Sequence, residues 1–248
     1  MKLIKYILII FGLVCIFSIP KIVYGTVAIS ATSSADGSSV SHTVTGSNVI
    51  AVAAIQWTQT SDRSVTGVTY GANAMTQIPT GGYTYNDVDH QIGCQLWYII
   101  NPPTGAQTVS VTYNGSISYS VISVTSFNGT GGAIGATATT GGYNTRSVSI
   151  TTQNNNSYIV NSHCFQDFDG NETPSQSETL VHSFNTANTN PRLSAASSYK
   201  LVSTAGPTNT GYVVTSNGRN GIMAIEIPPP TAPASTPTCR FKGHGACH

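Results

Sequence analysis

Charged side chains are scarce in this sequence. Lysine, arginine, aspartate and glutamate make up 8% of the 248 residues, against roughly 25% in an average soluble domain. Three of the ten basic residues are Lys2, Lys5 and Lys21, so the rest of the chain has seven basic residues against nine acidic ones. A protein that binds nucleic acid by neutralising phosphates needs a basic surface. This composition excludes that class of function.

Helical patterns are also missing. After the N-terminal region, no long stretch repeats apolar residues at the spacing of an amphipathic helix, and runs rich in Ala, Glu, Lys, Leu and Arg are absent. A coiled coil and a helical bundle are therefore excluded. Only one apolar run approaches the length of a membrane span, so we expect no membrane span in the mature chain.

That run belongs to the N-terminal 25 residues, which have the pattern of a secretory signal. Lys2 and Lys5 precede an apolar run over residues 6–19, and cleavage is expected before Thr26. An uncleaved membrane anchor is the alternative, but the run is shorter than the ~20 residues that a bilayer requires. We therefore expect residues 1–25 to be a signal peptide. The mature chain is predicted to be secreted, either extracellular or at the cell surface.

Cysteines support an exported protein. Four follow the predicted leader, Cys94, Cys164, Cys239 and Cys247, and an even number in an exported chain favours disulfides. Cys239 and Cys247 would close a short loop near the C-terminus, which leaves Cys94 to pair with Cys164. The alternatives are free buried thiols at Cys94 and Cys164 and a metal site formed by the C-terminal pair with nearby histidines.

Short strand-like segments separated by Gly, Asn, Pro or Ser continue from Thr26 to Ile227. Residues 48–57 are apolar on both alternate faces, which predicts a central strand covered on both sides. Further strands are expected over residues 65–70, 74–78, 92–100, 108–113, 119–127, 147–152, 158–164, 193–200, 212–215 and 222–227. The pattern predicts an all-β fold, a single jelly-roll-like antiparallel β-sandwich over residues 26–227. A barrel is the alternative, although the strand lengths are uneven.

The composition changes after Ile227. Residues 228–238 are rich in Pro and Thr and predict an extended, semi-rigid linker. Residues 239–248 form a small basic tail that contains cysteine and histidine. Its role is left open between a clasp, a contact site and the beginning of a further module.

A set of turns and strand ends forms a recurring pattern. It comprises residues 67–71 (Gly-Val-Thr-Tyr-Gly), 74–76 (Ala-Met-Thr), 96–98 (Leu-Trp-Tyr), 101–105 (Asn-Pro-Pro-Thr-Gly) and 108–112 (Thr-Val-Ser-Val-Thr), with residues 224–227 (Ala-Ile-Glu-Ile) as a closing strand. This pattern resembles secreted bacterial jelly-roll domains, concanavalin A-like in architecture, which are mostly uncharacterised. The resemblance implies the fold and export. It assigns no catalytic residue, and the C-terminal tail lies outside it.

Catalytic patterns are absent. A glycosidase needs two carboxylates on either side of one sugar bond, but most of the nine acidic residues lie in predicted turns. Glu226 lies in a predicted strand whose buried face the alternation does not define. No Gly-x-Ser-x-Gly nucleophile elbow occurs either. We therefore expect no catalytic residues.

One acidic loop has the composition of a cation site. Asp167, Asp169, Asn171 and Glu172 place side-chain oxygens around a glycine, which suits Ca²⁺. A solvated turn is the alternative reading, and residues 86–90 form a weaker version of the same pattern. No cofactor is expected to be required, and calcium is a possible ligand.

Aromatic residues give a second candidate site. The chain has 12 tyrosines, and tyrosine suits surfaces that stack on sugars or pack against like subunits. Tyr83 and Tyr85 lie in a predicted glycine-rich loop, and Trp97 opposes the apolar face of its strand. These three are the candidate ligand-binding residues, with core packing as the alternative for Trp97.

Together these features predict an exported, non-enzymatic structural or adhesive module. Self-association into filaments or a layer is one expectation, because low charge weakens the usual protection of strand edges. The alternative is a lectin-like carbohydrate-binding module with a structural calcium ion, and a glycoside hydrolase ranks third. The expected partner is therefore a second copy of the chain or an extracellular glycan.

Overall fold

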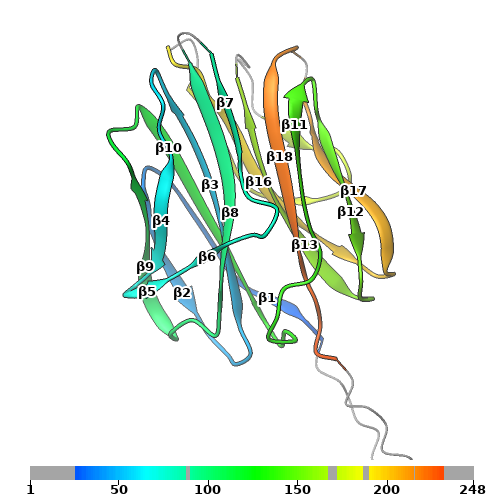
Figure 1. The fold of residues 1–248 in the computed structure, drawn as a ribbon. Helices are drawn as coiled ribbons and strands as arrows, with labels where there is room; N and C mark the ends of the chain where they lie inside the picture. Colours follow the sequence, from blue (N-terminus) through cyan, green and yellow to red (C-terminus); the bar gives the residue numbers. More distant parts are fainter. Residues whose placement is uncertain (1–25, 88–89, 167–171, 187–189, 215, 232–248) are drawn as a thin grey trace, which may run out of the picture.

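The computed structural model describes residues 26–87, 90–166, 172–186, 190–214 and 216–231. The predicted signal peptide, most of the linker and the Cys/His tail lie outside these residues. Every regular element of the described chain is a β-strand with antiparallel partners, which confirms the expected all-β antiparallel fold (Figure 1). This part of the chain contains no helix with the length and apolar character needed to cross a bilayer.

The first half of the described chain forms two sheets. Its inner sheet has the order β1 (Ala28–Asp36), β10 (Tyr119–Asn128), β3 (Ile50–Gln59), β8 (Gln91–Ile100) and β6 (Thr76–Gln77), and β7 (Tyr83–Asn86) also pairs with β8. Its outer sheet has the order β2 (Ser39–Val44), β9 (Gly105–Tyr113), β4 (Val65–Tyr70) and β5 (Asn73–Ala74).

The second half also forms an inner and an outer sheet. The inner sheet has the order β11 (Thr137–Tyr143), β18 (Arg219–Ile227), β13 (Ser157–Phe165), β16 (Ser194–Val202) and β15 (Thr179–Asn185). The outer sheet has the order β12 (Ser147–Thr152), β17 (Gly206–Val213) and β14 (Thr173–Pro174).

The two halves repeat one strand arrangement. The inner order β1-β10-β3-β8 corresponds to β11-β18-β13-β16, and the outer order β2-β9-β4 corresponds to β12-β17-β14. Asn48 and Asn156, with φ of 52° and 57°, make the same left-handed turn shortly before β3 and before β13. Asparagine tolerates this conformation better than most residues. The described chain is therefore two copies of one sandwich unit, packed inner sheet to inner sheet.

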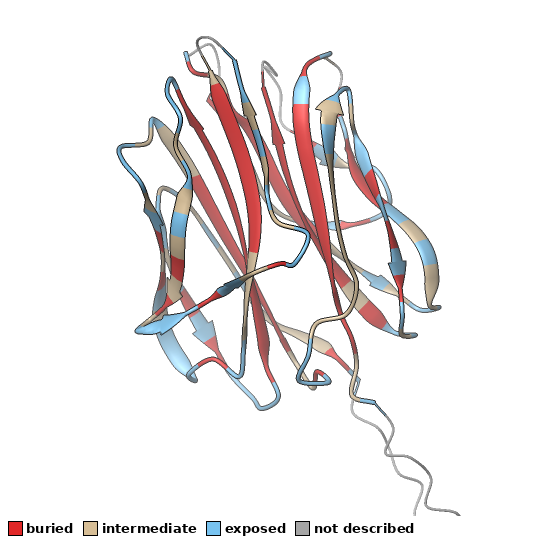
Figure 2. Cartoon of the chain, viewed as in Figure 1, coloured by how far each residue is buried: buried red, intermediate tan, exposed pale blue. Residues whose placement is uncertain are grey.

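Three apolar layers separate the four sheets. One lies between the two inner sheets and contains Val52 and Cys164, and one lies between each inner sheet and its outer partner. All ten residues of β3 are buried, because this strand has a sheet on each side. The prediction of a strand covered on both faces is confirmed, and Figure 2 shows buried residues along the inner strands.

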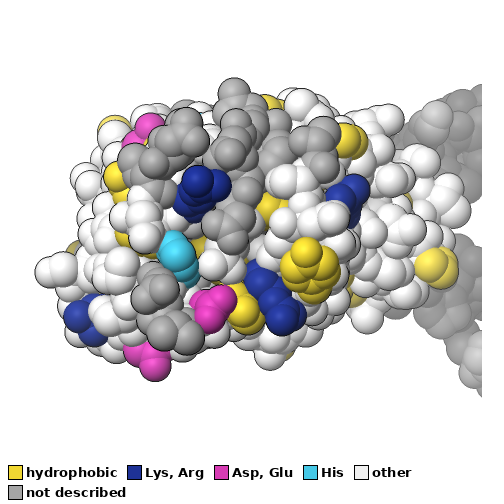
Figure 3. All heavy atoms as spheres, turned by 90° about the horizontal axis from the view of Figure 1, so that it is seen from above, with side chains coloured by type: hydrophobic (Ala, Val, Ile, Leu, Met, Phe, Trp, Pro, Cys, Tyr) yellow, Lys and Arg dark blue, Asp and Glu magenta, His cyan; other side chains and the backbone are white. Residues whose placement is uncertain are grey.

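Charged side chains gather at one end of the molecule, here called the loop end. It consists of the described parts of the connections that follow β1, β3, β7, β9, β11, β13, β15 and β17. Figure 3 looks down on this end and shows basic, acidic and histidine side chains among uncharged ones. Both ends of the described chain lie at the opposite end of the sandwich, where the Gly131 amide donates to the carbonyl of Pro228 at 3.2 Å.

Candidate functional site

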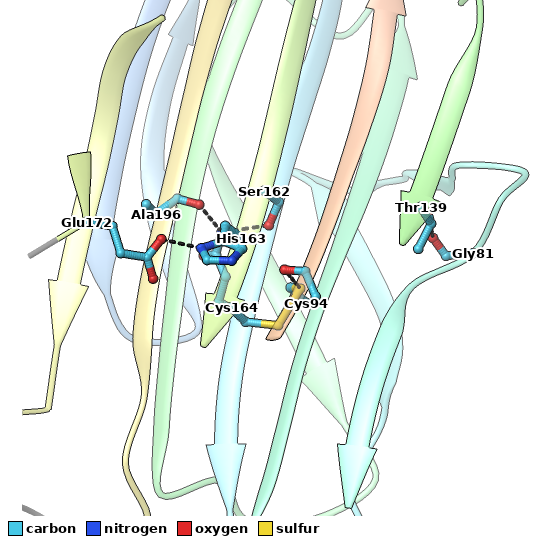
Figure 4. Close-up of a disulfide and its surroundings, with 10 residues drawn as sticks. Gly81, Cys94, Thr139, Ser162, His163, Cys164, Glu172 and Ala196 are labelled. Carbon is cyan, nitrogen blue, oxygen red and sulfur yellow. Dashed lines mark hydrogen bonds and ion pairs between the residues drawn. A yellow bond between two sulfur atoms is a disulfide. The ribbon is translucent and has the colours of Figure 1, made fainter. Parts of the chain in front are cut away.

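A disulfide joins the two halves of the molecule. Cys94 on β8 and Cys164 on β13 are linked, with Cα atoms 5.7 Å apart (Figure 4). This is the body pairing that the sequence predicts. It fixes the two inner sheets against each other and so defines how residues of one half face residues of the other. The predicted tail pair, Cys239 and Cys247, lies outside the described residues.

Tyr83 packs across the boundary between the two halves. It lies on β7 and faces two glycines, Gly141 and Gly221, which are paired across β11 and β18. A Cβ atom on Gly141 would lie 1.9 Å from the Tyr83 ring, and one on Gly221 would lie 2.1 Å from it. Burial raises the pKa of the Tyr83 phenol. Tyr83 therefore fills a space that only glycines leave open, and this contact positions β7.

Tyr85 lies two residues further along β7 and takes part in an aromatic and cationic cluster. The guanidinium carbon of Arg219 lies 4.9 Å from the ring centroid of Tyr85 and 5.7 Å from that of Tyr143. Arg219 and Tyr143 are cross-strand partners on β18 and β11, and Tyr143 is 60% exposed. The cluster is thus built from both halves. Sequence reasoning identifies Tyr85 but not Arg219 or Tyr143, for which no local motif exists.

A polar pocket opens beside Tyr85 at the loop end. It has a volume of about 220 Å³ and lies between the loop after β3 and the loop after β7. The Tyr85 hydroxyl donates to Asp87 Oδ2 at 3.5 Å, which connects the aromatic cluster to the pocket wall. The lining residues, here called the loop-end pocket, are Thr60, Ser61, Asp62, Asn86, Asp87, His90 and Gln91.

Hydrogen bonds within the loop-end pocket hold its polar groups in place. Asp62 Oδ1 accepts from the Asn86 side-chain amide and, at 3.4 Å, from Gln91 Nε2. Gln91 Oε1 in turn accepts from the backbone amide of Arg63 at 2.6 Å. The residues of the weaker predicted acidic loop therefore meet Asp62 from a different connection. Together they present donors and acceptors to one small volume.

Trp97 lies away from the two tyrosines. Its ring packs with the apolar layer between the inner and outer sheets of the first half, whereas Tyr83 and Tyr85 pack with the layer between the two inner sheets. The indole Nε1 donates to Gln95 Oε1 at 2.8 Å. The structure therefore brings together Tyr83 and Tyr85 but not Trp97, because successive residues of β8 alternate between its two faces.

The predicted calcium loop is described only at its last residue. Asp167, Asp169 and Asn171 lie outside the described residues. Glu172 is buried and its carboxylate is hydrogen-bonded to the His163 ring on β13 (Figure 4). The Tyr212 ring stacks on His163 with the ring centroids 5.1 Å apart. The described residues include no group of three or more His, Cys, Asp or Glu side chains that could hold a metal ion. The Glu172 carboxylate is directed to the interior, and the calcium site stays a prediction.

Glu226, the acidic residue whose face the alternation does not define, is fully buried at the end opposite to the pocket. Burial by itself would raise the pKa of its carboxyl group. Hydrogen bonds from the backbone of Ala136, Gln153 and Asn154 and from the Ser157 hydroxyl reverse this effect, so the pKa is lowered. Glu226 therefore anchors two loops and serves the fold.

No family model, curated protein or solved structure matches this chain. The resemblance to secreted bacterial jelly-roll domains stays a prediction.

Proposed function

We propose that the chain is an exported, non-enzymatic adhesive module that binds a glycan at the loop-end pocket. The observation that supports this most directly is the pocket itself, where carboxylate, amide and hydroxyl groups line one small volume whose wall the Tyr85 hydroxyl contacts at Asp87. Binding sites commonly combine a concave surface with a few fixed polar groups.

The chemistry of the lining suits sugar hydroxyls. Each hydroxyl group donates one hydrogen bond and accepts others, so it is matched by a mixture of acceptors such as Asp62 and amides such as Asn86 and Gln91. Tyr85 lies outside the lining, and its hydroxyl group donates to the Asp87 carboxylate in the pocket wall. The polar lining is therefore the part of the site that suits sugar hydroxyls.

The hydrogen bonding of the carboxylates supports binding as the proposed activity. Asp62 accepts hydrogen bonds from two neutral amides, and Asp87 accepts one from the Tyr85 hydroxyl. Such groups are oriented as acceptors for a ligand. The third expectation, glycoside hydrolysis, gains no support from this arrangement.

The position of the site also suits display. The described chain begins and ends at the opposite end of the sandwich from the pocket. A linker that continues after Ile227 would leave from that opposite end, so the pocket would point away from any anchor. This geometry is what an adhesive module requires.

A glycan array probed with residues 26–248, with the disulfide intact, tests the proposal. Asp62→Ala and Tyr85→Ala should each weaken binding about tenfold or more, since hydrogen bonds to charged groups contribute about 1.5–3 kcal/mol. Asp36→Ala is the matched control, because Asp36 lies at the same end but outside the pocket, paired with His182 at 2.9 Å. The proposal fails if no glycan binds, or if folded Asp62→Ala binds as tightly as the parent chain.

Self-association is a second candidate, favoured by two uncharged edge strands. β2 and β12 lie at the edges of the outer sheets, and their six residues each contain no Lys, Arg, Asp, Glu or Pro. Charges and prolines are the usual means of blocking edge pairing. Light scattering should show concentration-dependent oligomers that Ser41→Lys on exposed β2 abolishes, and a monomer at all concentrations would exclude this candidate.

A further inference from the structure

We infer that the glycan bound at the loop-end pocket is acidic, with its carboxylate, sulfate or phosphate group held by Arg219. This inference rests on the proposed function and adds the chemical class of the ligand. It follows from the state of the Arg219 side chain, from its neighbours and from its position beside the pocket.

Arg219 differs from other basic side chains of the described residues in its hydrogen bonding. The guanidinium of Arg63 donates to the carbonyl of Asp62 at 2.9 Å, that of Arg146 donates to the carbonyl of Ser216 at 3.3 Å, and Lys200 donates to the carbonyl of Asn209. The Arg219 guanidinium, by contrast, contacts the faces of two tyrosines and forms no ion pair within the described part of the chain. Its N–H groups remain available to a ligand.

The rings of Tyr85 and Tyr143 orient the Arg219 guanidinium so that it can bind an anion. A guanidinium presents its N–H donors in its plane, so contact with aromatic rings leaves the donor edge accessible. Two parallel N–H donors match the two oxygens of a carboxylate, sulfate or phosphate group. Tyr143 is the cross-strand partner of Arg219, and β7, which carries Tyr85, is held against β18 by the packing of Tyr83. A side chain restrained in this way loses less entropy on binding.

Tyr85 connects the cation to the pocket. One face of its ring contacts Arg219, and its hydroxyl donates to Asp87 in the pocket wall. A ligand with an acidic group and several hydroxyls can therefore reach both parts of the site across one tyrosine side chain. A free anion would leave the pocket empty, and a neutral sugar would leave Arg219 without a partner.

The two aspartates of the pocket set the orientation of the ligand. Asp62 and Asp87 would repel an anion placed inside the pocket, whereas they accept hydrogen bonds from hydroxyls. The acidic group must therefore lie on the Arg219 side of Tyr85. This division of charge predicts selectivity between glycans that differ only in the acidic substituent.

The test uses an array of matched glycans, in which each uronate, sialylated or sulfated member has a neutral counterpart. The parent chain should bind the acidic member of a pair at least tenfold more tightly. Arg219→Ala should reduce that preference to within about twofold, and Arg219→Lys should retain part of it because the charge is kept but the paired donors are lost. Arg146→Ala, at the same end of the molecule, is the matched control.

Each outcome decides between the two proposals. Equal binding of acidic and neutral members, or an Arg219→Ala protein that keeps the acidic preference, overturns the inference while glycan binding through Asp62 still stands. Binding of neither class overturns both. Thermal melting of each variant shows that it is folded, and Arg219→Lys provides a second folded variant if Arg219→Ala unfolds.

Discussion

Replacement of Gly221 by alanine should disturb both stability and binding. The added methyl group would lie 2.1 Å from the Tyr83 ring, far inside the ~3.5–4.0 Å at which carbon atoms make favourable contact. The ring already packs against Gly141, so closely that a Cβ atom built there would lie 1.9 Å from it, and it therefore has little room to move in that direction. The clash must therefore push β7 away from β18.

The expected cost can be set against a matched control. Overpacking a filled site typically destabilises a protein by about 1–3 kcal/mol. Gly67 lies in β4, where an added Cβ meets nothing within 4 Å, so Gly67→Ala should be neutral or stabilise by up to about 1 kcal/mol. We therefore expect Gly221→Ala to be less stable than Gly67→Ala by about 2 kcal/mol or more.

Urea unfolding with the disulfide intact provides the measurement. Both substitutions should also be made in a Tyr83→Ala background, where the ring is absent and Gly221→Ala should lose most of its cost. The reasoning is refuted if Gly221→Ala and Gly67→Ala are equally stable, or if the cost of Gly221→Ala is the same with and without Tyr83. Glycan binding should weaken in Gly221→Ala, because β7 carries Tyr85.

Three further predictions concern buried groups. The double substitution Cys94→Ala with Cys164→Ala removes a disulfide between residues 70 positions apart and should lower the free energy of unfolding by about 4 kcal/mol through loop entropy. A urea midpoint close to that of the parent would contradict this. Burial lowers the pKa of His42 from 6.5 to about 4, so the unfolded chain binds more protons between these values. The free energy of unfolding should fall by up to about 3 kcal/mol from pH 6.5 to pH 4 and then level off. His42→Gln should reduce this pH dependence, and an equal loss in that variant would show that other groups cause it. Glu226 has a lowered pKa, so its stabilisation is complete above its unfolded value of 4.5 and disappears at lower pH. Glu226→Gln should lower the free energy of unfolding by about 2 kcal/mol at pH 7, and an unchanged stability would show that the loop amides it binds find other acceptors.

Patterns of apolar residues predict several strands of both the inner and the outer sheets. β4 and β12 have the predicted bounds, β8 begins one residue earlier than predicted, and β3 is shifted by two residues at both ends. The patterns do not predict β2, β7, β14 or β15, and they do not predict β1 and β11, which lie at one edge of each inner sheet. Their sequences are mainly Ala, Ser, Thr and Gly, and their side chains are mostly partly buried. Edge strands of this kind are fixed by hydrogen bonds to a neighbour, β10 or β18, and such pairing leaves little trace in local hydrophobicity.

The candidate site was predictable only in part. Tyr83 and Tyr85 are recognisable candidates because exposing aromatic side chains in a glycine-rich segment is unfavourable unless they bind or pack against something. Residues 86–90 are recognisable by their acidic composition. Arg219 lies more than 130 positions after Tyr85 in the sequence, and their contact depends on how the two halves pack. Trp97 was grouped with the tyrosines by residue type, although β8 directs it to the other face. The missing information is the packing of sheets, which local patterns do not contain.

The duplication of the fold explains why the site lies where it does. Each half alone is a sandwich with one covered and one open inner face, and neither half contains both the pocket and the cation. The first half contributes Tyr85 and the loop-end pocket, and the second contributes Arg219 and Tyr143. Because the disulfide and the Tyr83 contact both cross the boundary between the halves, they hold these parts in register. Loss of either cross-link should therefore weaken binding of an acidic glycan before it unfolds the two sandwiches, since binding needs the halves aligned and folding of each needs mainly its own sheets.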